Sequence, residues 1–163
     1  NNIEKDVSNN IKKFVNAKRR MEEIILENNN IIIDDYAHHP NEIQSTYDAV
    51  KQKYSNHDIT IVFQPHTYTR TKTLFSEFTT CFDDVDELLL MDIYAAREKD
   101  TGIVSSDDLG NALRSKGIKC TNVHSHEEDA KLLKEKASEN DIVLTIGAGD
   151  VVKVADIILE KQI

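Results

Sequence analysis

The sequence has little cysteine, proline or glycine. Its 163 residues include two Cys, two Pro and five Gly, a composition that excludes a collagen-like chain and a disulfide-rich scaffold. Cys81 and Cys120 are far apart in the sequence, and neither belongs to a C-x-x-C pair. We therefore expect two inert thiols in or near the core, and neither a zinc site nor a disulfide.

Long apolar runs and an excess of positive charge are also absent. The longest apolar runs, such as Leu88–Met91, are far shorter than the roughly 18 residues of a membrane span, and no signal-peptide pattern opens the chain. Lys and Arg number 20 against 29 Asp and Glu, so the net charge of −9 repels nucleic-acid phosphates. We expect a cytoplasmic protein with no membrane insertion and no nucleic-acid partner.

What the sequence does contain is the composition of a compact domain. Hydrophobic residues make up 39% and charged residues 30% of the chain, a balance typical of folded proteins rather than disordered ones. The length is close to the roughly 150 residues of an average domain. We therefore expect one domain with a short attached segment.

From residue 31 onward, short β-branched runs alternate with amphipathic stretches. This alternation predicts an α/β fold in three layers, with a mostly parallel sheet covered by helices on both faces. The predicted strands are 31–35, 59–64, 87–92, 118–123 and 141–146, and helices are predicted near 106–116, 127–138 and 150–161. Two further stripes at helical spacing consist of Ile43, Tyr47, Val50 and Tyr54, and of Leu74, Phe75, Phe78 and Phe82. Residues 96–105 are predicted to form a loop.

The N-terminal part has a different pattern. Apolar residues recur at helical spacing from Ile3 to Val15, which predicts an amphipathic helix that ends before the basic cluster Lys18–Arg20. The asparagines at 28–30 separate the runs Glu23–Leu26 and Ile31–Ile33, and Asn tolerates the positive φ of tight turns, so we predict an antiparallel hairpin. Because the chain opens within a helical pattern, we expect a fragment of a longer protein.

Four polar loops follow the predicted strands. Ligands of open α/β sheets bind outside the carboxyl ends of the strands, where loops and helix N-termini converge. We therefore expect one binding face at this edge of the sheet. The loops are DDYAHHP (Asp34–Pro40), QPHTYTRT (Gln64–Thr71), DIYAARE (Asp92–Glu98) and GAGD (Gly147–Asp150).

Several of these residues also have simpler explanations. Asp34–Asp35 can merely end a strand, and Pro40 can begin a helix at its favoured first position. Adjacent residues such as His38–His39 rarely point at one metal ion, and no third ligand follows at helical spacing, so we expect no metal site. The GAGDVV stretch has Val152 where a dinucleotide fingerprint needs its third glycine, and it follows the last strand, so we expect no nicotinamide cofactor.

The basic residues leave two readings open. Arg70 and His66 share a loop with Tyr68 and three threonines, a set of donors suited to a carboxylate or phosphate, although a solvated loop has the same composition. The cluster Lys18–Arg20 is either a solvated patch or an anion clamp. The chain contains no G-x-x-x-x-G-K-[ST] loop, so any ATP chemistry needs residues outside it.

Five blocks in this order resemble the C-terminal part of the Mur ligases. The resemblance implies a Rossmann-like, three-layer α/β domain with a mostly parallel six-stranded sheet and an antiparallel N-terminal hairpin strand. It further implies that residues 1–20 are the tail of a central ATP-binding domain, and that residues 21–163 form the C-terminal, amino-acid-binding domain. The blocks are KRRME (Lys18–Glu22), DDYAHHPNE (Asp34–Glu42), FQPHTYTRT (Phe63–Thr71), YAAREKDTG (Tyr94–Gly102) and TIGAGD (Thr145–Asp150).

The resemblance also implies a reaction. Mur ligases form an amide at the expense of ATP, through an acyl phosphate, in peptidoglycan biosynthesis. Within the family the blocks are most similar to members that join L-alanine to UDP-N-acetylmuramate; a relative that attaches a recycled tripeptide shares DD-x-AHHP but lacks the HTYTR continuation. The full-length enzyme would use ATP and Mg²⁺ and need its N-terminal and central domains, so we expect this chain alone to hold no cofactor and to be inactive.

Site residues follow from the same resemblance, position by position. Arg20 corresponds to the arginine on the nucleotide ribose and phosphate, Asp35 to the acid on the ribose hydroxyls, and Tyr36 to a residue beside the adenine. Some members carry a second arginine where this chain has Thr67, so Arg70 alone is expected to pair with the alanine carboxylate. No catalytic residue is assigned. The predicted substrate-binding residues are His38, His66, Arg70, Gly147 and Asp150.

A signalling receiver domain is the alternative from another class of protein. Asp34–Asp35 after a first strand and ELLLMDIY (Glu87–Tyr94) at a third resemble a phosphoacceptor module, in which Asp92 would accept the phosphoryl group beside Mg²⁺. That pattern requires Lys-Pro after the last strand, where this chain has Gly147–Gly149. It also explains neither KRRME nor QPHTYTRT, so we favour the ligase.

Overall fold

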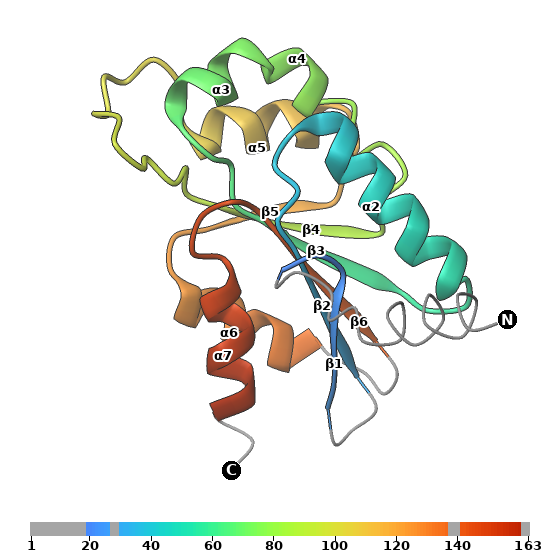
Figure 1. Cartoon of the computed structure of the whole chain (residues 1–163). Coiled ribbons are helices and arrows are strands. Elements are labelled where there is room, and N and C mark those ends of the chain that lie inside the picture. Colours follow the sequence, from blue (N-terminus) through green and yellow to red (C-terminus); the bar gives the residue numbers. More distant parts are fainter. Residues whose placement is uncertain (1–18, 27–29, 137–140, 161–163) are drawn as a thin grey trace, which may run out of the picture.

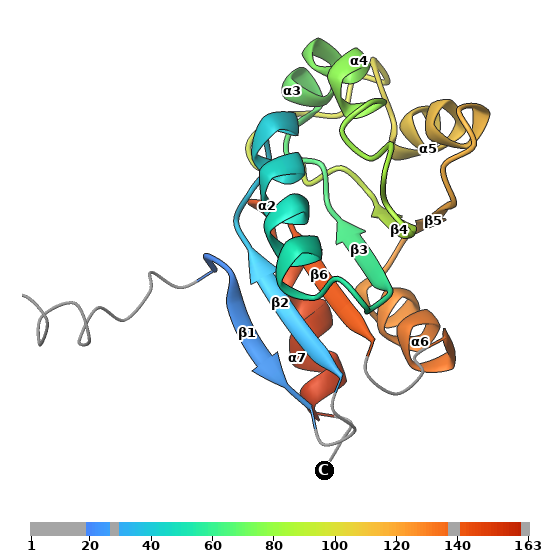
Figure 2. The ribbon, with the colours of Figure 1, turned by 90° about the vertical axis from the view of Figure 1, so that its right-hand side faces the viewer.

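The computed structural model describes residues 19–26, 30–136 and 141–160, in which six strands form one sheet between two layers of helices (Figures 1 and 2). The strands are β1 (Glu22–Ile25), β2 (Ile31–Asp35), β3 (Ile59–Phe63), β4 (Glu87–Met91), β5 (Cys120–Val123) and β6 (Ile142–Ile146). The helices are α2 (Pro40–Lys53), α3 (Tyr68–Thr73), α4 (Phe75–Phe78), α5 (Ser106–Ser115), α6 (His126–Lys136) and α7 (Val152–Glu160). The predicted fold class is confirmed, whereas the helix predicted from Ile3 to Val15 lies outside the described residues.

The strand order is β1-β2-β6-β3-β4-β5. β1 pairs antiparallel with β2, with Ile25 opposite Ile31, so the predicted hairpin is confirmed, and all other neighbours are parallel. The last strand therefore lies between the first two parallel strands. Receiver domains have the flavodoxin-like order 2-1-3-4-5, in which the last strand is at an edge. The receiver interpretation is wrong at the level of topology.

The five parallel strands, β2 to β6, bury side chains on both faces of the sheet, whereas no residue of β1 is fully buried. In β3, Ile61 and Phe63 pack with α2, α4 and α5, while Val62 between them packs with α6 and α7, because successive residues of a strand point to opposite faces. Figure 1 shows α2 to α5 on one side of the sheet and α6 and α7 on the other. This two-sided burial explains the continuous apolar runs of the strands.

The apolar stripe from Leu74 to Phe82 does not form one helix. The structure has two short helices, α3 and α4, followed by turns, in which the hydroxyl of Thr79 donates to the carbonyl of Ser76 and that of Thr80 to Glu77. Hydroxyls bound to nearby carbonyls compete with helix continuation. The predicted burial still holds, since Phe78 and Phe82 are fully buried and pack on Phe63 with ring centroids 5.6 and 5.3 Å away.

Two smaller expectations concern the thiols and the membrane. Cys81 and Cys120 are buried, and burial raises the pKa of Cys81 to about 12 and that of Cys120 to about 11, so both thiols stay protonated. No helix among the described residues is long and apolar enough to cross a bilayer.

Candidate functional site

The loops after β2, β3, β4 and β6 meet at one edge of the sheet. The Gly147 N–H donates to the Asp35 carbonyl over 3.2 Å, and the Tyr94 N–H donates to the Pro65 carbonyl over 2.8 Å. An isolated parallel β-bridge also pairs the backbones of His66 and Tyr94. Because parallel strands end at the same edge, the loops are contiguous although they are far apart in the sequence. The prediction that these loops share one face is confirmed.

A groove of about 530 Å³ lies where the chain enters β1 and leaves β2. It brings together Arg20, Asp35 and Tyr36, the three residues predicted to contact a nucleotide, with His38 from the substrate-binding set. The groove continues along the start of α2, where the Glu42 carboxylate accepts hydrogen bonds from the N–H groups of His38 and His39. Its other lining residues are Ala37, Asn41, Ser45 and Thr46.

The Asp35 carboxylate is largely engaged by the fold. Its Oδ2 accepts from the Met21 N–H at 2.9 Å, and its Oδ1 accepts from the Ala37 N–H at 2.8 Å and from the Thr46 hydroxyl at 3.3 Å. A carboxylate has about four acceptor positions. About one position is therefore left for a hydroxyl group in the groove.

His66 and Arg70 form a hydrogen-bonded pair at the start of α3. Nη1 of Arg70 lies 2.9 Å from Nδ1 of His66. A guanidinium group only donates, so Nδ1 accepts, and the neutral ring carries its proton on Nε2. Burial lowers the pKa of His66, and the charges of Arg70 and His38 lower it further, which keeps the ring neutral at pH 7. The His66 and His38 ring centroids are 6.0 Å apart, so the three predicted residues form one cluster.

Thr67 is the residue at which the resemblance to Mur ligases implies a second arginine in some members. It precedes α3 with φ 67, an unusual conformation for a β-branched residue, and its hydroxyl accepts from the Arg70 N–H at 3.4 Å. Its own N–H donates to the Tyr94 carbonyl. Thr67 therefore shapes the loop, and Arg70 is the one guanidinium that QPHTYTRT places here.

Asp150 lies in the segment between β6 and α7 and connects this segment to Gln64, which follows β3. Its carboxylate accepts from Gln64 and from Lys153, each at 2.9 Å, and lies 3.2 Å from Nε2 of His126. Burial alone would raise the pKa of Asp150, but these hydrogen bonds and positive charges outweigh it and hold the pKa at about 2. The structure thus gives Asp150 a framework role, and substrate contact by Gly147 or Asp150 stays a prediction.

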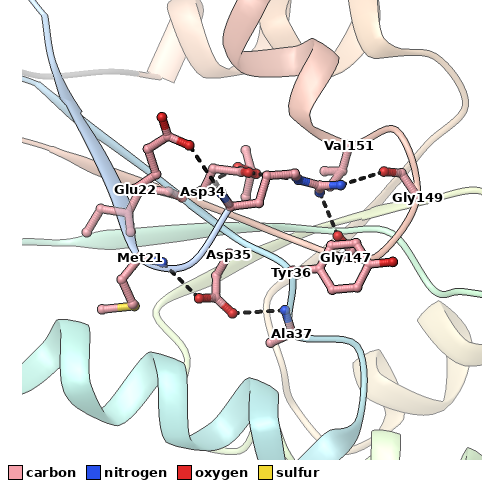
Figure 3. Close-up of polar contacts among 12 residues, drawn as sticks. Met21, Glu22, Asp34, Asp35, Tyr36, Ala37, Gly147, Gly149 and Val151 are labelled. Atoms are coloured by element: carbon pink, nitrogen blue, oxygen red, sulfur yellow. Dashed lines mark hydrogen bonds and ion pairs between the residues drawn. The ribbon is translucent and has the colours of Figure 1, made fainter. Parts of the chain in front are cut away.

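Sequence reasoning named Arg19 only within the basic cluster Lys18–Arg20 and missed its place at the rim. Its guanidinium donates through Nε to Asp34 at 2.9 Å, through Nη1 to the Gly149 carbonyl at 2.9 Å and through Nη2 to the Gly147 carbonyl at 2.6 Å. Figure 3 shows Asp34, Tyr36, Gly147 and Gly149 gathered around this group. The available signal was Asp34 itself, since an acid that ends a buried strand needs a basic partner.

The receiver interpretation fails at the site as well. Asp34 and Asp35 end β2, whereas Asp92 follows β4, and two strands, β6 and β3, lie between them in the sheet. Asp92 is exposed and accepts from the Ser106 hydroxyl at 2.9 Å, with His124 Nδ1 at the same distance. The three carboxylates do not converge on one phosphoacceptor site.

Comparisons with known proteins agree with the blocks. The family model described as Mur ligase, glutamate ligase domain, matches residues 19–149. A UDP-N-acetylmuramate–L-alanine ligase of Clostridium perfringens (strain 13 / Type A) is 54% identical over 160 residues, which are 98% of this chain and 35% of that protein. The ligase of the same name from Clostridium beijerinckii is 64% identical over 126 residues, 77% of this chain and 27% of that protein. The chain thus spans about a third of the length of the curated relatives it matches.

Solved structures show the same fold. A UDP-N-acetylmuramate–alanine ligase of Thermotoga maritima superposes with a TM-score of 0.73 at 26% identity, over 92% of this chain and 31% of that one. A folylpolyglutamate synthase of the same organism gives a TM-score of 0.65 at 13% identity, over 91% of this chain and 32% of that one. The second likeness concerns the fold alone.

Proposed function

This chain belongs to the Mur ligase family, and from that membership we propose that it is the C-terminal domain of an ATP-dependent ligase that joins L-alanine to UDP-N-acetylmuramate. The observation that carries the proposal is the pairing of two sites at one rim. A groove with Arg20, Asp35 and Tyr36 adjoins the cluster of His38, His66 and Arg70. The relatives' names supply the substrates.

We assign the domain boundary by contacts. The sequence blocks place it after residue 20, but Arg19 already hydrogen-bonds β2 and the segment before α7. The family match also begins at residue 19. We therefore propose that the C-terminal domain starts at Arg19 and that residues 1–18 belong to the central domain.

On the nucleotide side, each predicted residue has a matching chemistry. Tyr36 is 47% exposed and offers an aromatic ring to a base, and the remaining acceptor position of Asp35 suits a ribose hydroxyl. The exposed guanidinium of Arg20 suits a phosphate. The described residues contain no group of three metal-ligating side chains, so we propose no magnesium site among them.

On the amino-acid side, Arg70 is oriented for a carboxylate. The hydrogen bonds it makes within the described residues use Nη1, toward Nδ1 and the carbonyl of His66, which leaves the Nη2 edge for a bidentate partner. The neutral His66 adds an Nε2–H donor beside it. A closed site around these groups would also exclude water from a hydrolysable acyl phosphate.

The test uses the full-length protein that contains this chain. Removal of the carboxylate's partner from a water-poor site costs about 2–5 kcal/mol, so Arg70→Ala should raise the KM for L-alanine at least about tenfold and leave the KM for ATP nearly unchanged. Arg70→Lys should recover part of the loss, because a point charge cannot form the bidentate pair.

Arg20→Ala is the matched control and should show the reverse pattern. If Arg70→Ala instead weakened ATP and spared alanine, the roles of the two sites would be exchanged. A tripeptide that begins with L-alanine separates the alternative ligase, because a higher kcat/KM for it than for L-alanine would contradict our substrate. The 163-residue chain alone should release no phosphate from ATP in the presence of both substrates.

A further inference from the structure

Arg19 does not line the groove, yet it contacts the parts of the rim that surround it. Its three side-chain nitrogens reach Asp34 at the end of β2 and the carbonyls of Gly147 and Gly149 after β6. Its carbonyl accepts from the Tyr36 N–H at 2.8 Å, and its guanidinium carbon lies 5.2 Å from the centre of the Tyr36 ring. Arg19 thus joins Tyr36, β2 and the Gly147–Gly149 segment.

The backbone around Arg19 is bent to make these contacts. Arg19 has φ 61 and Met21 has φ 50, and both are left-handed conformations that residues with a Cβ seldom adopt. The bend is held by the Arg19–Tyr36 hydrogen bond and by that from Met21 N–H to Asp35, which Figure 3 shows. The same bend places Arg20 in the groove. The position of Arg20 therefore depends on how Arg19 is anchored.

The Gly147–Gly149 segment is held from both sides. From the β3 side, Gln64 accepts from the Val151 N–H and donates to Asp150. A Cβ on Gly149 would overlap the Gln64 side chain and lie 2.7 Å from Cγ of Tyr94, so the segment packs without spare room. From the β2 side, Arg19 makes the side-chain contacts described above. Loss of Arg19 would therefore release the Gly147–Gly149 segment on the β2 side and leave its contacts with Gln64 in place.

The electrostatics at Asp34 explain why this flank uses an arginine. The Asp34 side chain is 3% exposed, and its other oxygen accepts from the Thr145 hydroxyl at 2.7 Å. The Arg19 side chain, 20% exposed, supplies the compensating charge and still has two nitrogens for the carbonyls. A lysine offers one point of attachment and cannot reach all three acceptors in a plane.

We propose that Arg19 is a positioning residue of the nucleotide groove, which fixes Tyr36, Arg20 and the Gly147–Gly149 segment against β2. The proposal rests on the proposed function for the identity of the ligand, ATP. The positioning itself is a property of this chain and is tested separately. Arg114 is the matched control, because it donates to the Cys120 carbonyl and to the side chains of Asn122 and Asn111, on β5 and α5, and β5 is separated from β2 by three strands of the sheet.

The first experiment compares amide NMR spectra of the 163-residue chain and its variants. Arg19→Gln should shift the amides of Tyr36, Gly147 and Gly149 and abolish a slowly exchanging Nε–H signal, and Arg114→Gln should leave all of these in place. Shifts confined to the residues adjacent to Arg19 in the sequence would overturn the proposal. If Arg19→Gln does not fold, Asp34→Asn removes the negative charge that Nε of Arg19 faces and should shift the same three amides.

The second experiment measures kinetics of the full-length protein. Arg19→Gln should raise the KM for ATP about tenfold and change the KM for L-alanine less than about twofold. The reason is that displacement of Arg20 and Tyr36 weakens binding of the nucleotide they contact and leaves the amino-acid site in place. Arg19→Lys should fall between wild type and Arg19→Gln. Arg114→Gln should lower the melting temperature and leave both KM values unchanged.

The outcomes separate this proposal from the proposed function. Equal rises in both KM values, or a lowered melting temperature with unchanged KM values, would overturn the role of Arg19. A wild-type protein without ligase activity would overturn the proposed function instead, and the amide shifts would then decide the role of Arg19 alone. Added to Arg19→Gln, Asp34→Asn should raise the KM for ATP little further, because the two groups act through one contact.

Discussion

Two aspartates are buried on different elements of this molecule, and their surroundings differ. Asp34 at the rim is 2% exposed and has Arg19 and Thr145 as partners, whereas Asp129 on α6 is 0% exposed and neither of its oxygens has a partner among the described residues. Burial raises the pKa of Asp129 to about 7, and the charge of Glu128 contributes. A buried carboxylate therefore either recruits a cation and donors or takes up a proton.

The largest expected effect concerns the paired aspartate. Arg19→Met leaves Asp34 buried without its cation, which typically costs about 3–5 kcal/mol. The free energy of unfolding, measured by urea denaturation of the 163-residue chain, should fall by that amount. A loss below about 1 kcal/mol would mean that the rim relaxes and rehydrates Asp34, and the contrast with Asp129 would disappear.

The unpaired aspartate should make stability depend on pH in an unusual direction. Its folded pKa of about 7 lies above the ordinary value of 3.8, so the folded state holds a proton that the unfolded state releases. That contribution is complete below pH 3.8 and is lost as the pH rises through 7. Between pH 5 and pH 8 the wild type should therefore lose about 2–3 kcal/mol relative to Asp129→Asn.

Urea denaturation of both proteins at pH 5, 6, 7 and 8 gives the comparison. Asp129→Asn keeps the shape of the side chain and removes its titration, so its curve should lack this part of the pH dependence. Parallel pH profiles of the two proteins would show that Asp129 is not protonated by burial.

For Asp150 the expected pH dependence of stability has the opposite sign and a smaller size. Its folded pKa of about 2 lies below the ordinary 3.8, so its stabilisation is present above pH 3.8 and is lost as the pH falls toward 2. Asp150→Asn should lower the free energy of unfolding by about 2 kcal/mol at pH 7 and by less than about 1 kcal/mol at pH 2.5. Urea midpoints at pH 7 and pH 2.5 test this, and a constant difference at both would contradict it.

The smallest effect is expected for an ion pair outside both regions. Lys51 and Asp86 are 2.7 Å apart, with side chains 38% and 37% exposed. Exposed pairs contribute about 0–1 kcal/mol, so Lys51→Met should change the urea midpoint little. An effect as large as that of Arg19→Met would show that burial is not what distinguishes the rim pair.

Much of the fold follows from local patterns. Runs such as 59–64 and 141–146 predict the strands nearly to the residue, since an apolar run with turn residues on both sides depends on nearby sequence only. The start of α2 at Pro40 was predictable for the same reason. The stripe from Leu74 to Phe82 was not, because hydroxyl groups that bind nearby carbonyls broke the helix there.

The candidate site was predictable in part. Parallel strands end at one edge, so the loops after β2, β3, β4 and β6 had to lie together once the sheet was recognised as parallel. The resemblance then selected Arg20, Asp35 and Tyr36, and they share a groove. It did not select Arg19, whose acceptors at Gly147 and Gly149 are 128 and 130 positions away.

The sequence by itself determined the strands, the hairpin and the polar rim, because periodicity and turn residues act over a few positions. Only the tertiary structure decided that β6 lies between β2 and β3, which separates Asp92 from Asp34 and joins Arg19 to the segment before α7. It also decided that Asp34 has a cation and that Asp129 has no partner among the described residues. These features depend on which distant residues packing brings within hydrogen-bond distance, and no local pattern encodes that.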